Sequence, residues 1–171
     1  MIVSMKSCAI GIVFDSTKQK VLIIQRRDVP VWVLPGGGID RSETPEEAVV
    51  REVKEETGLN VAVVRKVAEY TPVNKLAQIT HVFECSPIDG ELTTGDETRL
   101  IEFRSLCSLP KLFFIIHLEW LVDAMKNEPD VIKKPLTNVN YWNLIKYFCS
   151  HPLHVLRFAL TKIGLPINSS S

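Results

Sequence analysis

The chain has 171 residues, of which 46% are hydrophobic and 23% are charged. This length fits one domain with a core of its own, and the composition is that of a globular protein rather than a disordered one. Lys and Arg together number 20, as do Asp and Glu. The chain therefore lacks the net positive charge that attracts a nucleic acid polymer, and no long nucleic acid partner is expected.

The cysteines and the N-terminal residues bear on the compartment. The four cysteines are far apart and include no C-x-x-C pair, which argues against a zinc or redox motif. Residues 1–7 lack the apolar run and cleavage site of a signal peptide. No uncharged apolar stretch reaches the roughly 18 residues that cross a bilayer. We expect a cytoplasmic protein that does not bind membranes.

Three short apolar runs near the N-terminus predict strands. Residues 9–14 and 21–25 are rich in β-branched side chains and are separated by the polar residues 15–20, so a hairpin is the simplest arrangement. The third run, at 31–34, leads into Pro35 to Gly38. A loop is expected there, because glycine permits backbone conformations that other residues resist.

The residues from Thr44 to Gly58 give the best helix prediction. Thr44 is a suitable N-cap, Pro45 would occupy the first helical position, and Glu47 would complete a capping box. Gly58 suits the residue after the last turn. We therefore expect a helix that begins after Thr44 and ends near Gly58.

Beyond Gly58 the pattern predicts an irregular alternation of strands and helices. Apolar runs at 61–64, 79–83 and 101–106 are typical of strands, and Asp89-Gly90 favours a turn. Residues 117–126 predict an amphipathic helix, whose apolar face would carry Leu118, Leu121, Val122 and Met125. We assign residues 1–130 to one domain.

Residues 131–171 are interpreted as a helical C-terminal extension. Helices are expected at 141–149 and 153–163, with a break at His151-Pro152 because proline disfavours helical geometry in the residue before it. The second helix would carry an apolar stripe of Leu153, Leu156, Leu160 and Ile163. Such a stripe needs a partner, so the extension is expected to pack on the domain or on a second copy, which allows a homodimer.

The residues from Gly37 to Leu59 carry the pattern that points to chemistry. Gly37 is followed at fixed intervals by Glu43, by Arg51-Glu52, by Glu55-Glu56 and by Gly58-Leu59. This segment resembles the Nudix hydrolases, whose signature G-x5-E-x7-R-E-U-x-E-E-x-G-U, with U aliphatic, it matches position for position. Gln25-Arg26 and the residues 34–36 also resemble members of that family. Asp40 and Ser42 depart from commoner choices but lie outside the invariant positions.

The spacing of the glutamates has a physical meaning of its own. Glu52, Glu55 and Glu56 stand at i, i+3 and i+4 and would share one face of the predicted helix. Three like charges so close together favour a hard divalent cation with oxygen ligands, and magnesium keeps open positions for substrate phosphates. A merely solvated glutamate-rich face is the alternative, and for an isolated cluster it would be preferred.

The resemblance implies a fold, a reaction and a set of site residues. The fold would be an α/β/α sandwich with a mixed sheet. The reaction would be Mg²⁺-dependent hydrolysis of a phosphoanhydride bond, with Mn²⁺ as a possible substitute. The small-molecule substrate would be a nucleoside triphosphate, an oxidised nucleotide, ADP-ribose or a nucleotide sugar. The implied metal ligands are Glu52, Glu55 and Glu56, with the Gly37 carbonyl and Glu43 as further candidates.

Other roles concern proton transfer and phosphate binding. Arg51 would orient the catalytic glutamates through charge-assisted hydrogen bonds. Arg26 would contact the substrate phosphates, although it could equally be a solvated charge at the end of a strand. The general base would be Glu52 or, as in members that use a downstream loop, Glu97, with Glu102 as the third choice. Glu97 and Glu102 could equally be ordinary surface carboxylates.

Two other functions stay open at the level of sequence. A nucleotide-sensing domain could keep the fold without the reaction, although a pure binder has no need of three metal-facing carboxylates. Removal of phosphate from the 5′ end of RNA is disfavoured by the neutral net charge, unless a local basic patch compensates.

Overall fold

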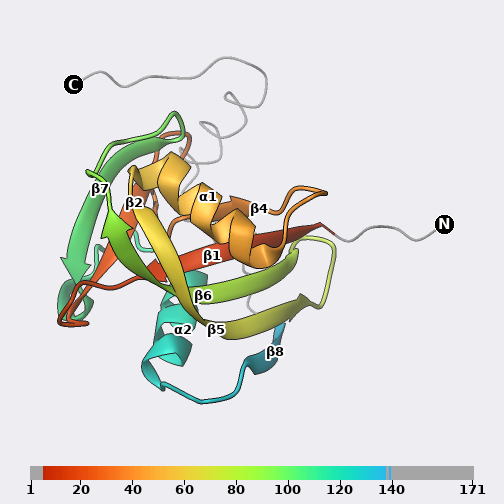
Figure 1. The fold of residues 1–171 in the computed structure, drawn as a ribbon. Helices are drawn as coiled ribbons and strands as arrows, with labels where there is room; N and C mark the ends of the chain where they lie inside the picture. The colour runs from red at the N-terminus through yellow and green to blue at the C-terminus, as the bar shows by residue number, and fades with distance from the viewer. Residues whose placement is uncertain (1–5, 138, 140–171) are drawn as a thin grey trace.

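The structure is a computed structural model that describes residues 6–137 and 139, and two sheets and two α-helices organise these residues (Figure 1). The larger sheet has the strand order β4-β1-β6-β5-β8, in which β1 pairs with β6, and β5 with β8, in parallel, whereas the other pairs are antiparallel. Its strands are β4 (Gly36–Gly38), β1 (Ser7–Val13), β6 (Ile79–Asp89), β5 (Asn60–Pro72) and β8 (Ile132–Leu136). The smaller sheet contains β3 (Trp32–Val33), β2 (Lys20–Arg26) and β7 (Thr98–Ser105).

The helices cover opposite faces of the larger sheet, which confirms the predicted α/β/α sandwich with a mixed sheet (Figure 1). Helix α1 spans Pro45–Thr57 and α2 spans Ile115–Met125, and a 3-10 turn, η1, lies at Leu106–Ser108. Alternation along β1 explains how one strand serves both sides. Ile10 and Ile12 belong to the core under α2, whereas Ala9 and Val13 belong to the core under α1.

The N-terminal strand pairing differs from the sequence prediction. A single bridge, Phe14 to Val21, links β1 to β2, and the two strands then separate into different sheets, so the predicted hairpin is wrong. The predicted loop at Pro35 to Gly38 is also wrong in part, because Gly36–Gly38 form β4 and pair with β1. Glycine keeps both backbone hydrogen-bonding groups, so it can extend a sheet wherever a neighbouring strand is available.

Local signals at α1 are confirmed in detail. The Thr44 hydroxyl accepts a hydrogen bond from the Glu47 backbone N–H at 3.2 Å, and the Glu47 carboxylate accepts one from the Thr44 N–H at 2.8 Å. At the other end Gly58 adopts a left-handed φ of 78°, and its N–H donates to the Lys54 carbonyl. Both ends of the helix that carries the glutamate cluster are therefore fixed by short-range interactions.

Helix α2 is present, but of the four residues predicted for its apolar face only Leu121 is buried. Leu118, Val122 and Met125 are exposed, whereas polar His117 and Asp123 are buried. Each of these polar groups has a partner, since His117 Nδ1 accepts from the Leu34 N–H at 2.9 Å and Asp123 accepts from the Tyr70 hydroxyl at 2.6 Å. Hydrogen-bonded polar side chains can thus occupy positions that hydrophobic periodicity assigns to the surface.

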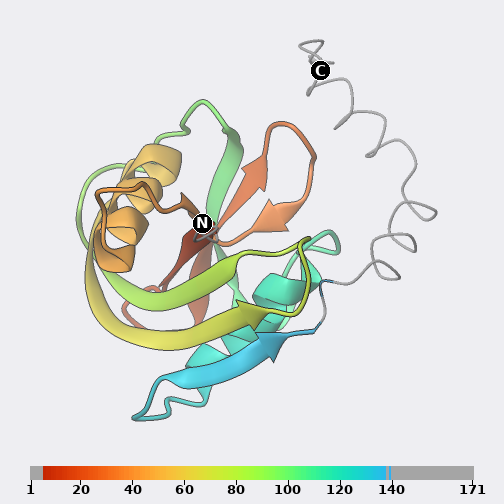
Figure 2. The same cartoon turned by 90° about the vertical axis from the view of Figure 1, so that its right-hand side faces the viewer.

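The end of the described chain adds a strand. Residues 132–136 form β8, which lies beside β5 at the edge of the larger sheet (Figure 2). The prediction that 131–171 is helical is therefore wrong for β8, which belongs to the sheet. The two expected helices at 141–149 and 153–163 lie outside the described residues. None of the helices in the part of the chain that the structure describes has the length and hydropathy needed to span a bilayer.

The capping box yields a prediction of stability. Thr44→Ala removes the side-chain acceptor of the Glu47 N–H, so the free energy of unfolding should fall by about 1 kcal/mol. Urea unfolding monitored by circular dichroism measures the change. Ser42→Ala, which removes an exposed hydroxyl from the same loop, is the control. Equal stability of the two variants would contradict an energetic role for the box.

Candidate functional site

The acidic face of α1 lies against the glycine strand β4. Val49 and Val53 point into the core under α1, so the adjacent positions Glu52 and Glu56 face β4. A Cβ atom on Gly37 would lie 2.6 Å from the carboxylate of Glu52, so a larger residue there would force that carboxylate to move. The Gly36 N–H donates to Oε2 of Glu56 at 2.8 Å. The glycines thus supply both space and a hydrogen bond to two of the glutamates.

Arg51 joins three of the predicted site glutamates. Its Nε and Nη2 donate to the two oxygens of Glu43 at 2.6 and 2.9 Å, and its Nη1 donates to Glu52 at 2.9 Å and to Glu55 at 3.2 Å. Nη2 also reaches the Gly38 carbonyl at 3.0 Å. The hydrogen bonds to Glu43, followed by those to Glu52, raise the pKa of the Arg51 guanidinium above its ordinary value. Arg51 is therefore placed where it could orient these glutamates, which is the role that the sequence resemblance implies for it.

Glu56 carries the most perturbed carboxylate of the cluster. Its side chain is almost buried, with 8% exposure, and burial raises its pKa to about 7, with the nearby charges of Glu52 and Glu97 acting in the same direction. Burial likewise raises the pKa of Glu52, and Glu55 and Glu97 raise it further, whereas Arg51 opposes them. Negative charge is therefore only partly compensated between α1 and the residues that face it.

The loop before β7 brings Glu97 to this cluster. Glu97 raises the pKa of both Glu52 and Glu56, although some 40 residues separate it from them in sequence, and its carboxylate lies 4.0 Å from Nη2 of Arg26. Arg26, at the end of β2, is held by two hydrogen bonds to Asp28 at 2.8 and 2.7 Å. A guanidinium and three carboxylates thus lie around one part of the surface.

The structure separates the predicted site residues into two groups. The contacts above bring together most of the predicted site residues, namely Glu43, Arg51, Glu52, Glu56, Gly37, Arg26 and Glu97. Glu55 touches Arg51, but its side chain is 59% exposed. Glu102 lies further along β7, where its carboxylate is 3.6 Å from Arg104. Within residues 6–137, no three His, Cys, Asp or Glu side chains converge as they stand on one metal position.

Sequence reasoning missed two residues beside the site. Asp28 fixes the Arg26 guanidinium through paired hydrogen bonds, and the spacing Arg26-x-Asp28 was the only signal for it. Arg27 binds the backbone of the Glu97 loop. Its partners lie about 70 residues away, so no local pattern could identify them.

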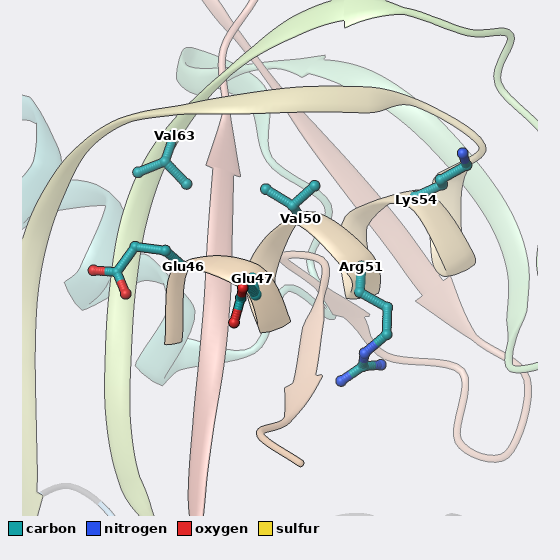
Figure 3. A pocket seen from close by; sticks show the side chains of 6 residues that line it. All are labelled: Glu46, Glu47, Val50, Arg51, Lys54 and Val63. Carbon is teal, nitrogen blue, oxygen red and sulfur yellow. The ribbon is translucent and has the colours of Figure 1, made fainter. Parts of the chain in front are cut away.

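A groove on the outer side of α1 is distinct from the acidic cluster. It lies between α1 and β5 and is lined by Glu46, Glu47, Val50, Arg51, Lys54 and Val63. Val50 and Val63 face each other across it, whereas the Arg51 side chain points away from them (Figure 3). Of the predicted site residues, only Arg51 lines this groove.

Two relatives share a large part of this sequence. The chain is 38% identical over 110 residues to a protein of Bacillus subtilis named putative 8-oxo-dGTP diphosphatase, covering 64% of this chain and 72% of that protein. It is 43% identical over 101 residues to the ADP-ribose pyrophosphatase of Methanocaldococcus jannaschii, covering 56% of this chain but only 60% of that protein.

Solved structures extend the likeness to three dimensions. An ADP-ribose pyrophosphatase from Streptococcus suis superposes with a TM-score of 0.63 at 28% identity, covering 77% of this chain and 99% of that one. A UDP-X diphosphatase, at 20% identity, shares the fold with a TM-score of 0.65 over 78% of this chain and 68% of that one. The sequence model of the NUDIX domain matches residues 5–127, which is more than half of the chain. The chain therefore belongs to the Nudix hydrolase family.

Proposed function

We propose that this chain hydrolyses a phosphoanhydride bond in a nucleoside diphosphate linked to a further group, with Mg²⁺ as its cofactor. The observation that carries the proposal is the group formed by Glu52, Glu56 and Glu97 beside Arg26. In it the pKa of Glu56 is raised to about 7 by burial and by its acidic neighbours. Such a concentration of negative charge next to a guanidinium suits a metal ion and a phosphate together.

The donor chemistry fits magnesium. Carboxylate oxygens are its preferred protein ligands, and it is commonly held by one or two carboxylates, with water and substrate phosphate completing the shell. Glu52 and Glu56 would hold the ion, and Glu55, on the same face of α1, could join them. Glu43 would support these ligands through its hydrogen bonds to Arg51. A bound Mg²⁺ would stabilise negative charge on the phosphate oxygens and lower the pKa of a water molecule. The Gly37 carbonyl stays a predicted further ligand.

The contacts of Glu52, Glu97 and Arg26 suggest which residue accepts the proton and which binds the phosphate. Arg51 holds Glu52 in place, which suits a ligand better than a proton acceptor. Glu97 is 75% exposed and its carboxylate lies 4.0 Å from Nη2 of Arg26, so it is the base that we favour for activating the attacking water. Arg26, oriented by Asp28, would bind a substrate phosphate through its planar fork of donors.

The substrate class is drawn from chemistry and from the relatives together. Relatives named for ADP-ribose and for 8-oxo-dGTP both act on nucleotides that contain a phosphoanhydride bond. Another relative, 39% identical over 62 residues, is named RNA pyrophosphohydrolase. We propose a small nucleotide as the substrate, because the net charge of the chain is zero. Cytoplasmic location and a homodimer through residues 131–171 stay predictions.

Phosphorus NMR in ¹⁸O-labelled water tests this proposal. The purified protein with Mg²⁺ is given ADP-ribose, 8-oxo-dGTP, a nucleotide sugar and a 5′-triphosphorylated RNA in separate reactions. We expect cleavage of at least one of the three small nucleotides, with ¹⁸O in one product phosphate. Cleavage of the RNA alone would favour the RNA function, and binding without cleavage would favour the nucleotide-sensing function.

Glu52→Gln should abolish most turnover while the protein stays folded. The substitution removes one charge and one ligand at nearly constant volume, so activity should fall by at least the ~100-fold typical of losing a group that merely supports a ligand. Initial rates at several Mg²⁺ concentrations measure the loss. Glu46→Gln, on the exposed first turn of the same helix, is the matched control. Near-normal Mg²⁺-dependent activity of Glu52→Gln would contradict the metal assignment.

Glu56 predicts a pH-dependent change in stability. The folded protein holds this proton up to a pH of about 7, whereas an unfolded chain releases it near its ordinary value of 4.5. Stability from neutral Glu56 is therefore complete below pH 4.5 and lost as the pH rises towards 7. In EDTA at pH 8, Glu56→Gln should be more stable than the unsubstituted protein by up to about 3 kcal/mol.

Urea unfolding at pH 5 and pH 8 checks this sign. The difference between Glu56→Gln and the unsubstituted protein should shrink at pH 5, and Glu46→Gln should show no such dependence. Mg²⁺ should stabilise the unsubstituted protein at pH 8 more than it stabilises Glu56→Gln. A Glu56→Gln variant that is less stable at pH 8 would show that the buried carboxylate is compensated within the fold.

A further inference from the structure

The loop that carries Glu97 is bound by a single arginine. The Arg27 backbone N–H donates to the Glu97 carbonyl at 2.9 Å. Its side chain makes two more hydrogen bonds: Nε donates to the Asp96 carbonyl at 3.0 Å, and Nη2 donates to the Thr98 carbonyl at 2.9 Å. Three successive carbonyls of the loop therefore accept hydrogen bonds from one residue at the end of β2.

The other side of this loop rests on α1. A Cβ atom on Gly95 would lie 2.1 Å from the carbonyl oxygen of Glu55, so the loop backbone touches the helix that carries Glu52 and Glu56. The Thr98 N–H also donates to the Gly95 carbonyl at 3.2 Å and closes a turn around Glu97. The loop is thus held between the end of β2 and the C-terminal part of α1.

Side-chain packing does little to position Glu97 itself. Its side chain is 75% exposed, and its closest ionic contact, with Arg26, is 4.0 Å long. Its place near Glu52 and Glu56 must therefore come from the backbone to which it is attached. Arg27 is the residue that binds this backbone most extensively among the described contacts.

We propose that Arg27 is a positioning residue that holds Glu97 at the distance from the metal-binding glutamates that proton transfer requires. The inference rests on the proposed function, because it takes Glu97 as the base. Adjacent arginines then have separate tasks: Arg26 faces the phosphate site, and Arg27 fixes the loop. The planar guanidinium reaches the carbonyls of Asp96 and Thr98 from two nitrogens held in a fixed geometry, which the single nitrogen of a lysine ammonium group does not reproduce.

A double-mutant cycle tests this role. Arg27→Met, Glu97→Gln and the double variant are compared with the unsubstituted protein for kcat and KM on ADP-ribose and on 8-oxo-dGTP with Mg²⁺. Small misplacement of a reacting group costs up to about a hundredfold in rate, so Arg27→Met should lower kcat by about ten- to a hundredfold, with KM changed less than about threefold. In the Glu97→Gln background the same substitution should cost less than about twofold. Arg27→Lys should be intermediate.

Arg104→Met is the matched control. Arg104 lies on β7 and, like Arg27, donates from Nε to a backbone carbonyl, that of Ser108, but at the end of β7 away from the Glu97 loop. The Arg104→Met variant should therefore lose a similar hydrogen bond without a change in kcat. An equal loss of kcat in Arg104→Met and Arg27→Met would mean that general stability, and not the loop, is responsible.

Hydrogen exchange gives a readout that needs no substrate. In Arg27→Met, the backbone amide of Thr98, which donates to the Gly95 carbonyl, should exchange at least about tenfold faster, while those in the middle of α1 are unchanged. Unchanged exchange in the loop would overturn the inference even if no tested nucleotide were cleaved.

The failures of the two proposals are distinguishable. If Glu97→Gln lowers kcat but Arg27→Met lowers it equally in both backgrounds, the positioning role is wrong and the base assignment stands. If Glu97→Gln leaves kcat unchanged while substrate is still hydrolysed, the base assignment and the inference both fall. Absence of hydrolysis by the unsubstituted protein contradicts the proposed function and the role of Glu97 as a base, and hydrogen exchange then still decides whether Arg27 fixes the loop.

Discussion

Concentrated negative charge on one face of α1 is the constraint that organises this structure. Glu52 and Glu56 lie against β4 because Gly37 leaves room for one carboxylate and the Gly36 N–H binds the other. Arg51 compensates Glu43, Glu52 and Glu55, but Glu56 keeps a raised pKa of about 7. A metal ion that also binds a phosphate would neutralise the negative charge that Arg51 leaves uncompensated.

Local interactions made the helix and the glutamate cluster predictable from sequence. The capping box at Thr44 and the left-handed Gly58 depend on residues within one turn, so their pattern is complete in the sequence itself. The same holds for the positions of Glu52 and Glu56, because helical spacing alone puts them on one face. The family signature covers this segment, so the fold class followed from it as well.

Pairing between distant segments could not be predicted in the same way. The separation of β1 from β2 depends on β6 and β7, which lie far along the chain. The buried face of α2 depends on partners for His117 and Asp123 that periodicity does not reveal. Arg27 belongs to the same class, because three carbonyls about 70 residues away determine its role. Glu97 was predicted only as one of several acidic candidates for the same reason.

The alternation of β1 has a consequence for how this protein can vary during evolution. Ile10 and Ile12 support α2, whereas Ala9 and Val13 support α1 and, through it, the glutamates. Substitutions at neighbouring positions of one strand should therefore differ in effect: those at the first pair alter chiefly the core under α2, and those at the second alter the core under the helix that carries the glutamates. The two helices share the sheet backbone, yet the side chains that pack under α2 are not those that pack under α1.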